Sequence, residues 1–381
     1  MTAETEPAPR PDTDSDHPSL SAVPAPLLTE AEVQSLTAII HDVSGSSPAE
    51  TNHWELETMA PLNVVSAAAI ARLRAYTPPP FPLWDRLPVS RRAAVLLLLY
   101  ADRQGDLRVV LTMRAANMRT FSGHAAFPGG KAESAAETPY QIARREAWEE
   151  IGLPIDDEKI PHPFKIEFLC HLPHNLARTS LAVRPCVALL HTPPPPGPAD
   201  PAAADRQPSV GSMIPRLDPR EVAAVFSGPF ANFLAAADAG HDRSALPPGH
   251  WYDGRWITFQ NHPWRVHNFY VPVNNQRVAR PRPEERRGEE GELADRLEEK
   301  EKEGEGRGGD GVEAGRYKVW GMTAKILVDA AVVAYGRRPE FEHNERAGDE
   351  EIIIAAEADG EFFDKAKAAG AGANTGEPAK M

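Results

Sequence analysis

The stretch from residue 127 to residue 153 constrains the fold of this chain most, and it reads FPGGKAESAAETPYQIARREAWEEIGL. Its two adjacent glycines predict a turn in which backbone segments approach closely. Thr138 followed by Pro139 is typical of a helix start, because the hydroxyl caps the first turn and proline suits its first position. Gly152 is placed to cap the helix end in a left-handed conformation. We therefore expect a glycine turn leading into a capped helix.

Acidic side chains crowd the second half of this predicted helix. Glu146, Glu149 and Glu150 are three or four residues apart or adjacent, so their side chains converge on one face. Like charges placed in this way repel, and a hard cation such as Mg²⁺, which takes oxygen ligands, would relieve the repulsion. A solvated acidic face is the usual alternative for clustered helix glutamates. The glycine turn and Arg145, which can orient carboxylates by charge-assisted hydrogen bonds, favour a metal site instead.

The segment resembles the Nudix box, whose second half is matched in full by residues 145–153. The loop before Arg145 is one residue longer than in the general box, and this leaves open whether Glu133 or Glu137 is the outer carboxylate. The same extension occurs in the coenzyme A diphosphatase branch of the family, which the chain also resembles elsewhere. Those other segments are LTMRA at 111–115, Arg119, Gly123, FPGG at 127–130, Arg178-Thr179, VRP at 183–185 and WGMTA at 320–324.

The resemblance implies an α/β fold, a Nudix-type α/β/α sandwich with a mixed β-sheet. It also implies metal-dependent hydrolysis of the diphosphate bond of coenzyme A, giving 3′,5′-ADP and 4′-phosphopantetheine. The expected site residues are Glu149, Glu146 and Arg145 for catalysis, Glu146, Glu149 and Glu150 for Mg²⁺ or Mn²⁺, and Arg114, Arg119, Gly129 and Gly130 for the substrate. An ion pair at the surface is an equal alternative for the two substrate arginines.

Several alternatives stay open at this point. The pattern does not say which glutamate is the general base, and Glu137 and Glu221 are weaker candidates for an auxiliary ligand or base. A second enzyme function is hydrolysis of oxidised nucleoside triphosphates, and a third function is an inactive binding module. The signature around Arg114 favours coenzyme A, and three intact, mutually repelling acids argue against an inactive site.

Composition limits the partners and the compartment. A formal net charge of −14 argues against a general nucleic-acid binder, which needs a basic surface. No apolar run approaches the length of a membrane span. Cys170 and Cys186 are the only cysteines and lie in apolar runs, so we expect buried thiols in a reducing compartment.

The chain ends in Ala379-Lys380-Met381, which is similar to the Ser-Lys-Leu peroxisome signal. A tripeptide of this kind also arises by chance. Together with the family resemblance it favours a peroxisomal location and an import receptor as partner, and a cytoplasmic or mitochondrial location is the alternative.

The 38 prolines, the 27 glycines and several polar tracts indicate that much of the chain is not packed. We expect a disordered leader at 1–28, a helical and extended segment at 29–87, the catalytic domain at 88–340 and a low-complexity tail at 341–381. Low-complexity insertions are expected at about 192–212 and 277–315. Predicted helices are 28–43, 64–76, 220–234 and 320–335, and predicted strands are 93–100, 107–113, 164–171, 180–190 and parts of 251–273.

Overall fold

The computed structural model describes residues 61–115, 123–192, 217–238, 246–274, 276, 278–280, 312–313 and 315–360. All of them belong to one compact unit. Several predictions fall outside the described residues: the leader, the helix at 28–43, nearly all of the insertion at 192–212, most of the insertion at 277–315, Arg119, and the terminal Ala379-Lys380-Met381.

The first of two β-sheets is mixed, as predicted. Its strand order is β3-β2-β1-β7-β5, and β4, β6 and β8 pair with β1, β7 and β2. Strand β1 runs antiparallel to β2 and parallel to β7. The strands are β1 (Arg92–Ala101), β2 (Leu107–Arg114), β3 (Ala125–Ala126), β4 (Gly129–Lys131), β5 (Lys165–His171), β6 (Asn175–Leu176), β7 (Ala182–His191) and β8 (Val222–Pro229).

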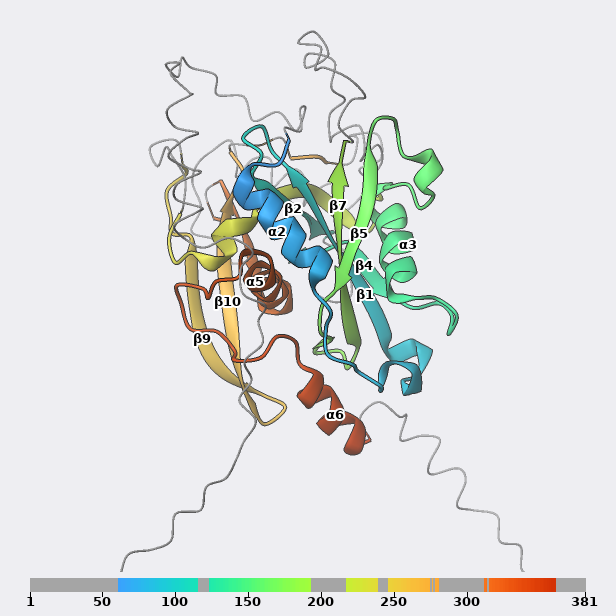
Figure 1. The fold of residues 1–381 in the computed structure, drawn as a ribbon. Helices are drawn as coiled ribbons and strands as arrows, with labels where there is room; N and C mark the ends of the chain where they lie inside the picture. Colours follow the sequence, from blue (N-terminus) through green and yellow to red (C-terminus); the bar gives the residue numbers. More distant parts are fainter. Residues whose placement is uncertain are drawn as a thin grey trace, which may run out of the picture. The chain divides into compact units, whose positions relative to one another are not determined.

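Helices cover both faces of this sheet, which confirms the predicted sandwich (Figure 1). Successive side chains of a strand point to opposite faces. Leu96 and Leu98 of β1 accordingly pack with helix α3 (Pro139–Ile151). Leu97 and Leu99 join the cluster that contains α2 (Val64–Ala75) and α5 (Gly321–Tyr335).

A second, antiparallel sheet lies beyond α5 (Figure 1), in the order β11-β12-β10-β9. Its strands are β9 (Tyr252–Phe259), β10 (His262–Pro272), β11 (Val312–Glu313) and β12 (Arg316–Trp320). Strand β12 runs directly into α5, the predicted closing helix. The Thr323 hydroxyl in the first turn of α5 donates to the Ala125 carbonyl at 3.3 Å, which ties this junction to β3.

The predicted helix over 220–234 is wrong. Residues 222–229 form strand β8, which pairs with β2, and residues 230–234 form a short 3₁₀ helix, η6 (Phe230–Leu234). Val222, Val225 and Phe226 recur at helical spacing, but every residue from 222 to 228 is buried. A strand covered on both faces is apolar throughout, so its pattern shows no alternation and is easily read as a helix.

The packed region also extends past the predicted boundary at residue 340. Helix α6 (Glu350–Ala358) lies within the predicted low-complexity tail, and it buries Ile352 and Ile353. Three short 3₁₀ helices complete the described elements: η1 (Trp84–Arg86), η2 (Val89–Arg91) and η3 (Asp157–Lys159). No helix among the described residues has the length and apolar character needed to cross a membrane.

Candidate active site

Helix α3 forms as predicted, and its two ends are fixed by caps. The Thr138 hydroxyl accepts a hydrogen bond from the Gln141 amide at 3.3 Å, and the Gln141 side chain accepts one from the Thr138 amide at 2.9 Å. Gly152 ends the helix with a φ of 72°, a left-handed value that favours glycine. The caps fix where the helix starts and stops, and hence where its acids lie.

The glycine turn brings β4 against both β1 and the acidic helix. Gly130 pairs with Ala94 of β1. A Cβ atom on Gly130 would lie 2.4 Å from Oε1 of Glu146, and one on Gly129 would lie 2.5 Å from the Ala94 carbonyl oxygen. Both positions therefore require glycine, because any side chain would displace a site carboxylate or the sheet backbone.

Arg145 joins three of the carboxylates. Its Nε lies 2.9 Å from Glu137 Oε1, and its Nη1 lies 3.1 Å from Glu146 Oε1 and 3.3 Å from Glu149 Oε2. Glu133 is 3.7 Å from the same guanidinium, and its side chain is largely exposed. Glu137, rather than Glu133, thus closes on Arg145 from the longer loop.

Hydrogen bonds keep Glu137 charged. Burial alone would raise the pKa of this carboxyl, but Arg145 and the backbone amides of Glu133 and Ser134 lower it. Those amides donate to Glu137 Oε2 at 2.7 and 3.3 Å. The side chain therefore ties its own loop to the helix through Arg145.

Glu150 is the buried acid of the site, with 3% of its surface exposed. Its Oε2 accepts a hydrogen bond from the Gly129 amide at 3.2 Å. Burial raises the pKa of Glu150 to about 8, Arg114 opposes this rise, and Glu146 and Glu221 add to it. The carboxyl therefore tends to hold a proton at neutral pH when no cation is near.

Glu221 is only a weak candidate from the sequence, which predicts a helix at its position. It precedes β8, and its backbone carbonyl accepts a hydrogen bond from the Ala115 amide at 2.9 Å. Its negative charge raises the pKa of both Glu146 and Glu150, so it lies close to them. The pairing of β8 with β2 brings it there, and no local sequence signal predicts that pairing.

Arg114, at the end of β2, has a polar atom without a partner. Its Nε is buried and makes no hydrogen bond with any other described residue. Its charge lowers the pKa of Glu150, which places the guanidinium near the acids. An unpaired buried donor beside an acidic site is suited to a phosphate oxygen.

The donor atoms of the glutamates suit a hard divalent cation, although Arg145 engages Glu146 and Glu149 in their present arrangement. No group of three or more His, Cys, Asp or Glu side chains within the described ranges stands ready to hold a metal ion. The donors are oxygens, and Glu146 fills the space that a Cβ on Gly130 would take. Burial raises the pKa of Glu150, and the like charges of Glu146 and Glu221 add to the rise. Ligation by Glu146, Glu149 and Glu150 stays a prediction.

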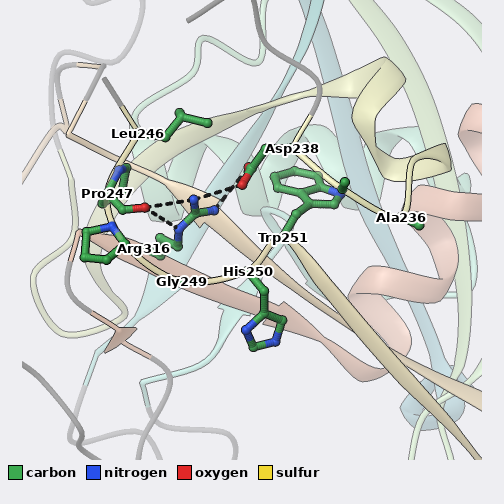
Figure 2. Close-up of a pocket in the computed structure, with 10 residues that line it drawn as sticks. Ala236, Asp238, Leu246, Pro247, Gly249, His250, Trp251 and Arg316 are labelled. Carbon is green, nitrogen blue, oxygen red and sulfur yellow. Dashed lines mark hydrogen bonds and ion pairs between the residues drawn. The ribbon is translucent and has the colours of Figure 1, made fainter. Parts of the chain in front are cut away.

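A cavity of about 420 Å³ beside the second sheet does not carry this chemistry. Figure 2 shows Arg316 in it, between Asp238 and the Pro247 carbonyl. The guanidinium makes two bonds to the Asp238 carboxylate, at 3.1 and 2.9 Å, and donates to Pro247 at 3.0 Å. Its charge is therefore already neutralised, and none of the predicted site residues lines the cavity.

Comparison with known proteins points to one family. The family model of the NUDIX domain matches residues 90–175. Peroxisomal coenzyme A diphosphatase 1 of Saccharomyces cerevisiae is 30% identical over 284 residues, which cover 70% of this chain and 76% of that protein. Nudix hydrolase 15, mitochondrial, of Arabidopsis thaliana is 30% identical over a region that covers 66% of this chain and 61% of the Arabidopsis protein. A peroxisomal coenzyme A diphosphatase of Caenorhabditis elegans is 35% identical over a region that covers 27% of this chain and 41% of the nematode protein.

Proposed function

This chain belongs to the Nudix hydrolase family, and on that premise we propose that it hydrolyses the diphosphate bond of coenzyme A or of its acyl or oxidised derivatives. Water adds across the bridging P–O bond, and the products are 3′,5′-ADP and 4′-phosphopantetheine or its derivative. The names of the yeast and nematode relatives support this substrate. The observation that carries the chemistry is the group of carboxylates around Arg145, beside the buried Glu150 and the glycine turn.

Glu146, Glu149 and Glu150 are the proposed ligands of Mg²⁺ or Mn²⁺. When bound, such a cation neutralises phosphoryl oxygens and lowers the pKa of water. Arg145 orients Glu146 and Glu149 through its hydrogen bonds to their carboxylates, and its hydrogen bond to Glu137 holds Arg145 in place. Glu149, whose side chain is about half exposed, is the box carboxylate best able to accept a proton from the attacking water.

The substrate contacts are proposed for two arginines and the glycine turn. The unpaired Nε of Arg114 would donate to a phosphate oxygen, and Arg119 would add a second positive charge. The backbone of Gly129 and Gly130 lets the diphosphate approach Glu146 without a side chain in the way.

A substrate panel with the purified protein and Mg²⁺ tests this proposal. Release of 4′-phosphopantetheine from coenzyme A supports it. Preference for an oxidised nucleoside triphosphate would assign the second enzyme function, and absence of turnover on every substrate would indicate a binding module.

Glu150→Gln tests the role of the buried acid. The amide has the same shape and is neutral, so the fold should tolerate it, but a negative ligand is lost. We expect kcat to fall roughly 100-fold or more, because several kcal/mol of charge stabilisation disappear. The matched control is Glu158→Gln, at an exposed position of η3. Equal kcat in the two variants would remove Glu150 from the ligand set.

We also propose a peroxisomal location, supported by the names of the yeast and nematode relatives and by the terminal tripeptide. The Arabidopsis relative is named mitochondrial, so the location needs its own test. A fluorescent protein fused ahead of this chain should enter peroxisomes, and removal of Ala379-Lys380-Met381 should leave it in the cytosol. Peroxisomal import without the tripeptide would refute its role.

A further inference from the structure

Lys318 of β12 is a cation held between two aromatic rings. Its Nζ lies 5.6 Å from the ring centroid of Tyr270 and 5.7 Å from that of Trp320. No carboxylate among the described residues forms an ion pair with it, and its side chain is partly buried. Aromatic faces attract a cation but accept no ordinary hydrogen bond from it, so the two rings leave the hydrogen-bond donors of the ammonium group unused.

Asp253, a carboxylate of the same sheet, is already engaged by other side chains. Asp253 of β9 pairs in register with Asn268 of β10. Its Oδ1 accepts from the Asn268 amide at 2.6 Å, and its Oδ2 accepts from the Tyr270 hydroxyl at 3.0 Å and lies 3.2 Å from His250 Nε2. These partners occupy both carboxylate oxygens of Asp253, and no ion pair joins it to Lys318 within the described part of the chain.

A chain of contacts links Lys318 to the candidate active site. The Trp320 ring meets the His124 ring edge-on at 5.0 Å. The His124 carbonyl accepts a hydrogen bond from the Arg114 amide at 3.1 Å. Arg114 in turn lies near Glu150, whose pKa it lowers. These contacts connect Lys318 of the second sheet to the end of β2 in the first sheet, where Arg114 lies.

We propose that Lys318 binds the phosphate monoester on the ribose of coenzyme A and so selects substrates that carry it. This inference rests on the proposed function, because it assigns a part of that substrate to a residue outside the Nudix box. The ammonium group donates charge-assisted hydrogen bonds to the monoester, and the partial exclusion of water by Tyr270 and Trp320 strengthens them.

The test compares coenzyme A with dephospho-coenzyme A, which lacks only this phosphate. Lys318→Met keeps the length of the side chain and removes the charge. We expect the ratio of kcat/KM for coenzyme A to kcat/KM for dephospho-coenzyme A to fall roughly 10- to 100-fold, mainly through KM, as loss of a hydrogen bond to a charged group predicts. Lys318→Arg, which restores a cation, should recover most of the ratio. The proposal is overturned if Lys318→Met has the same ratio of the two kcat/KM values as the wild type. An equal loss of activity on both substrates leaves this ratio unchanged and also overturns the proposal.

Two further measurements separate this proposal from the proposed function. Lys165→Met, at an exposed position of β5 on the far edge of the first sheet, is the matched control and should keep the wild-type ratio. If the wild type does not cleave coenzyme A, the proposed function fails, and calorimetry with 3′,5′-ADP and 5′-AMP decides the role of Lys318 alone. If the wild type binds 3′,5′-ADP more tightly than 5′-AMP and Lys318→Met binds both equally, the role is supported. Any other calorimetric result overturns it.

Discussion

At the scale of single residues, the charge state of Glu150 matters most for the site. The carboxyl is almost fully buried and accepts a hydrogen bond from the Gly129 amide. Burial raises its pKa from an ordinary value of 4.5 to about 8, and neighbouring acids reinforce this. The folded protein thus holds a proton on Glu150 over a pH range in which the unfolded chain has released it.

This difference predicts a pH dependence of stability in protein treated with a chelator. Because the folded state binds the extra proton between about pH 4.5 and 8, the free energy of unfolding should decrease as the pH rises through that window. Each unit of the pKa difference corresponds to about 1.4 kcal/mol. Glu150→Gln has no such proton, so urea unfolding should show a shallower decline than in the wild type. Glu158→Gln should follow the wild-type curve, and parallel curves for all three proteins would contradict the shifted pKa.

At the scale of elements, the site depends on how closely β4 and α3 approach each other. Gly130 and Glu146 occupy adjoining space, and a Cβ on the glycine would overlap the carboxylate. The contact is therefore a property of two elements together, and it can be measured as a coupling between two substitutions.

We expect Gly130→Ala to destabilise the protein by about 1–3 kcal/mol, as overpacking does, and to lower activity by displacing Glu146. In a Glu146→Ala background the added methyl group has room, so most of this loss of stability should disappear. Urea unfolding of the wild type, the two single variants and the double variant gives the coupling energy. Additive effects of the two substitutions would mean that the close approach is absent in solution.

Elements with local signals were predicted correctly. Helix α3 is marked in the sequence by Thr138 and Gly152 at its ends. Strands β1 and β2, which flank the turn at Asp102–Asp106, are marked by short apolar runs. The strand β8 was missed because burial on both faces removes the alternation that marks a strand. The position of Glu221 beside the acids follows from the pairing of β8 with β2, and such long-range pairing leaves no mark in the nearby residues.

At the scale of the whole molecule, a buried polar network fastens the segment after α5 to the core. Lys325, which is fully buried, lies 3.0 Å from Asp329 Oδ2 and 3.6 Å from Asp349 Oδ1. His343 Nε2 lies 2.8 Å from Asp329 Oδ1 and its Nδ1 lies 2.9 Å from His267 of β10. Burial would raise the pKa of Asp329, but Lys325 and His343 lower it. The network thus joins α5, the second sheet and the start of α6.

Truncation should show where the folded unit ends. A chain that stops after Gly360 keeps every partner in this network, so it should be more stable than a chain that stops after Glu340. A chain that stops after Glu340 loses His343, Asp349 and the buried face of α6, and breaking buried charge pairs costs about 3–5 kcal/mol. Chemical denaturation of both proteins decides this, and equal stability of the two would place the boundary at 340, as the sequence pattern predicted.

The bonds of Arg145 to Glu137, Glu146 and Glu149 have a wider consequence. The guanidinium offsets one of the negative charges around the proposed ligands, so the protein carries a resident counter-ion of its own. Such an enzyme does not need to be assembled around its metal, and it can lose the ion and regain it without refolding. Supply of the cation would then govern how fast the protein works.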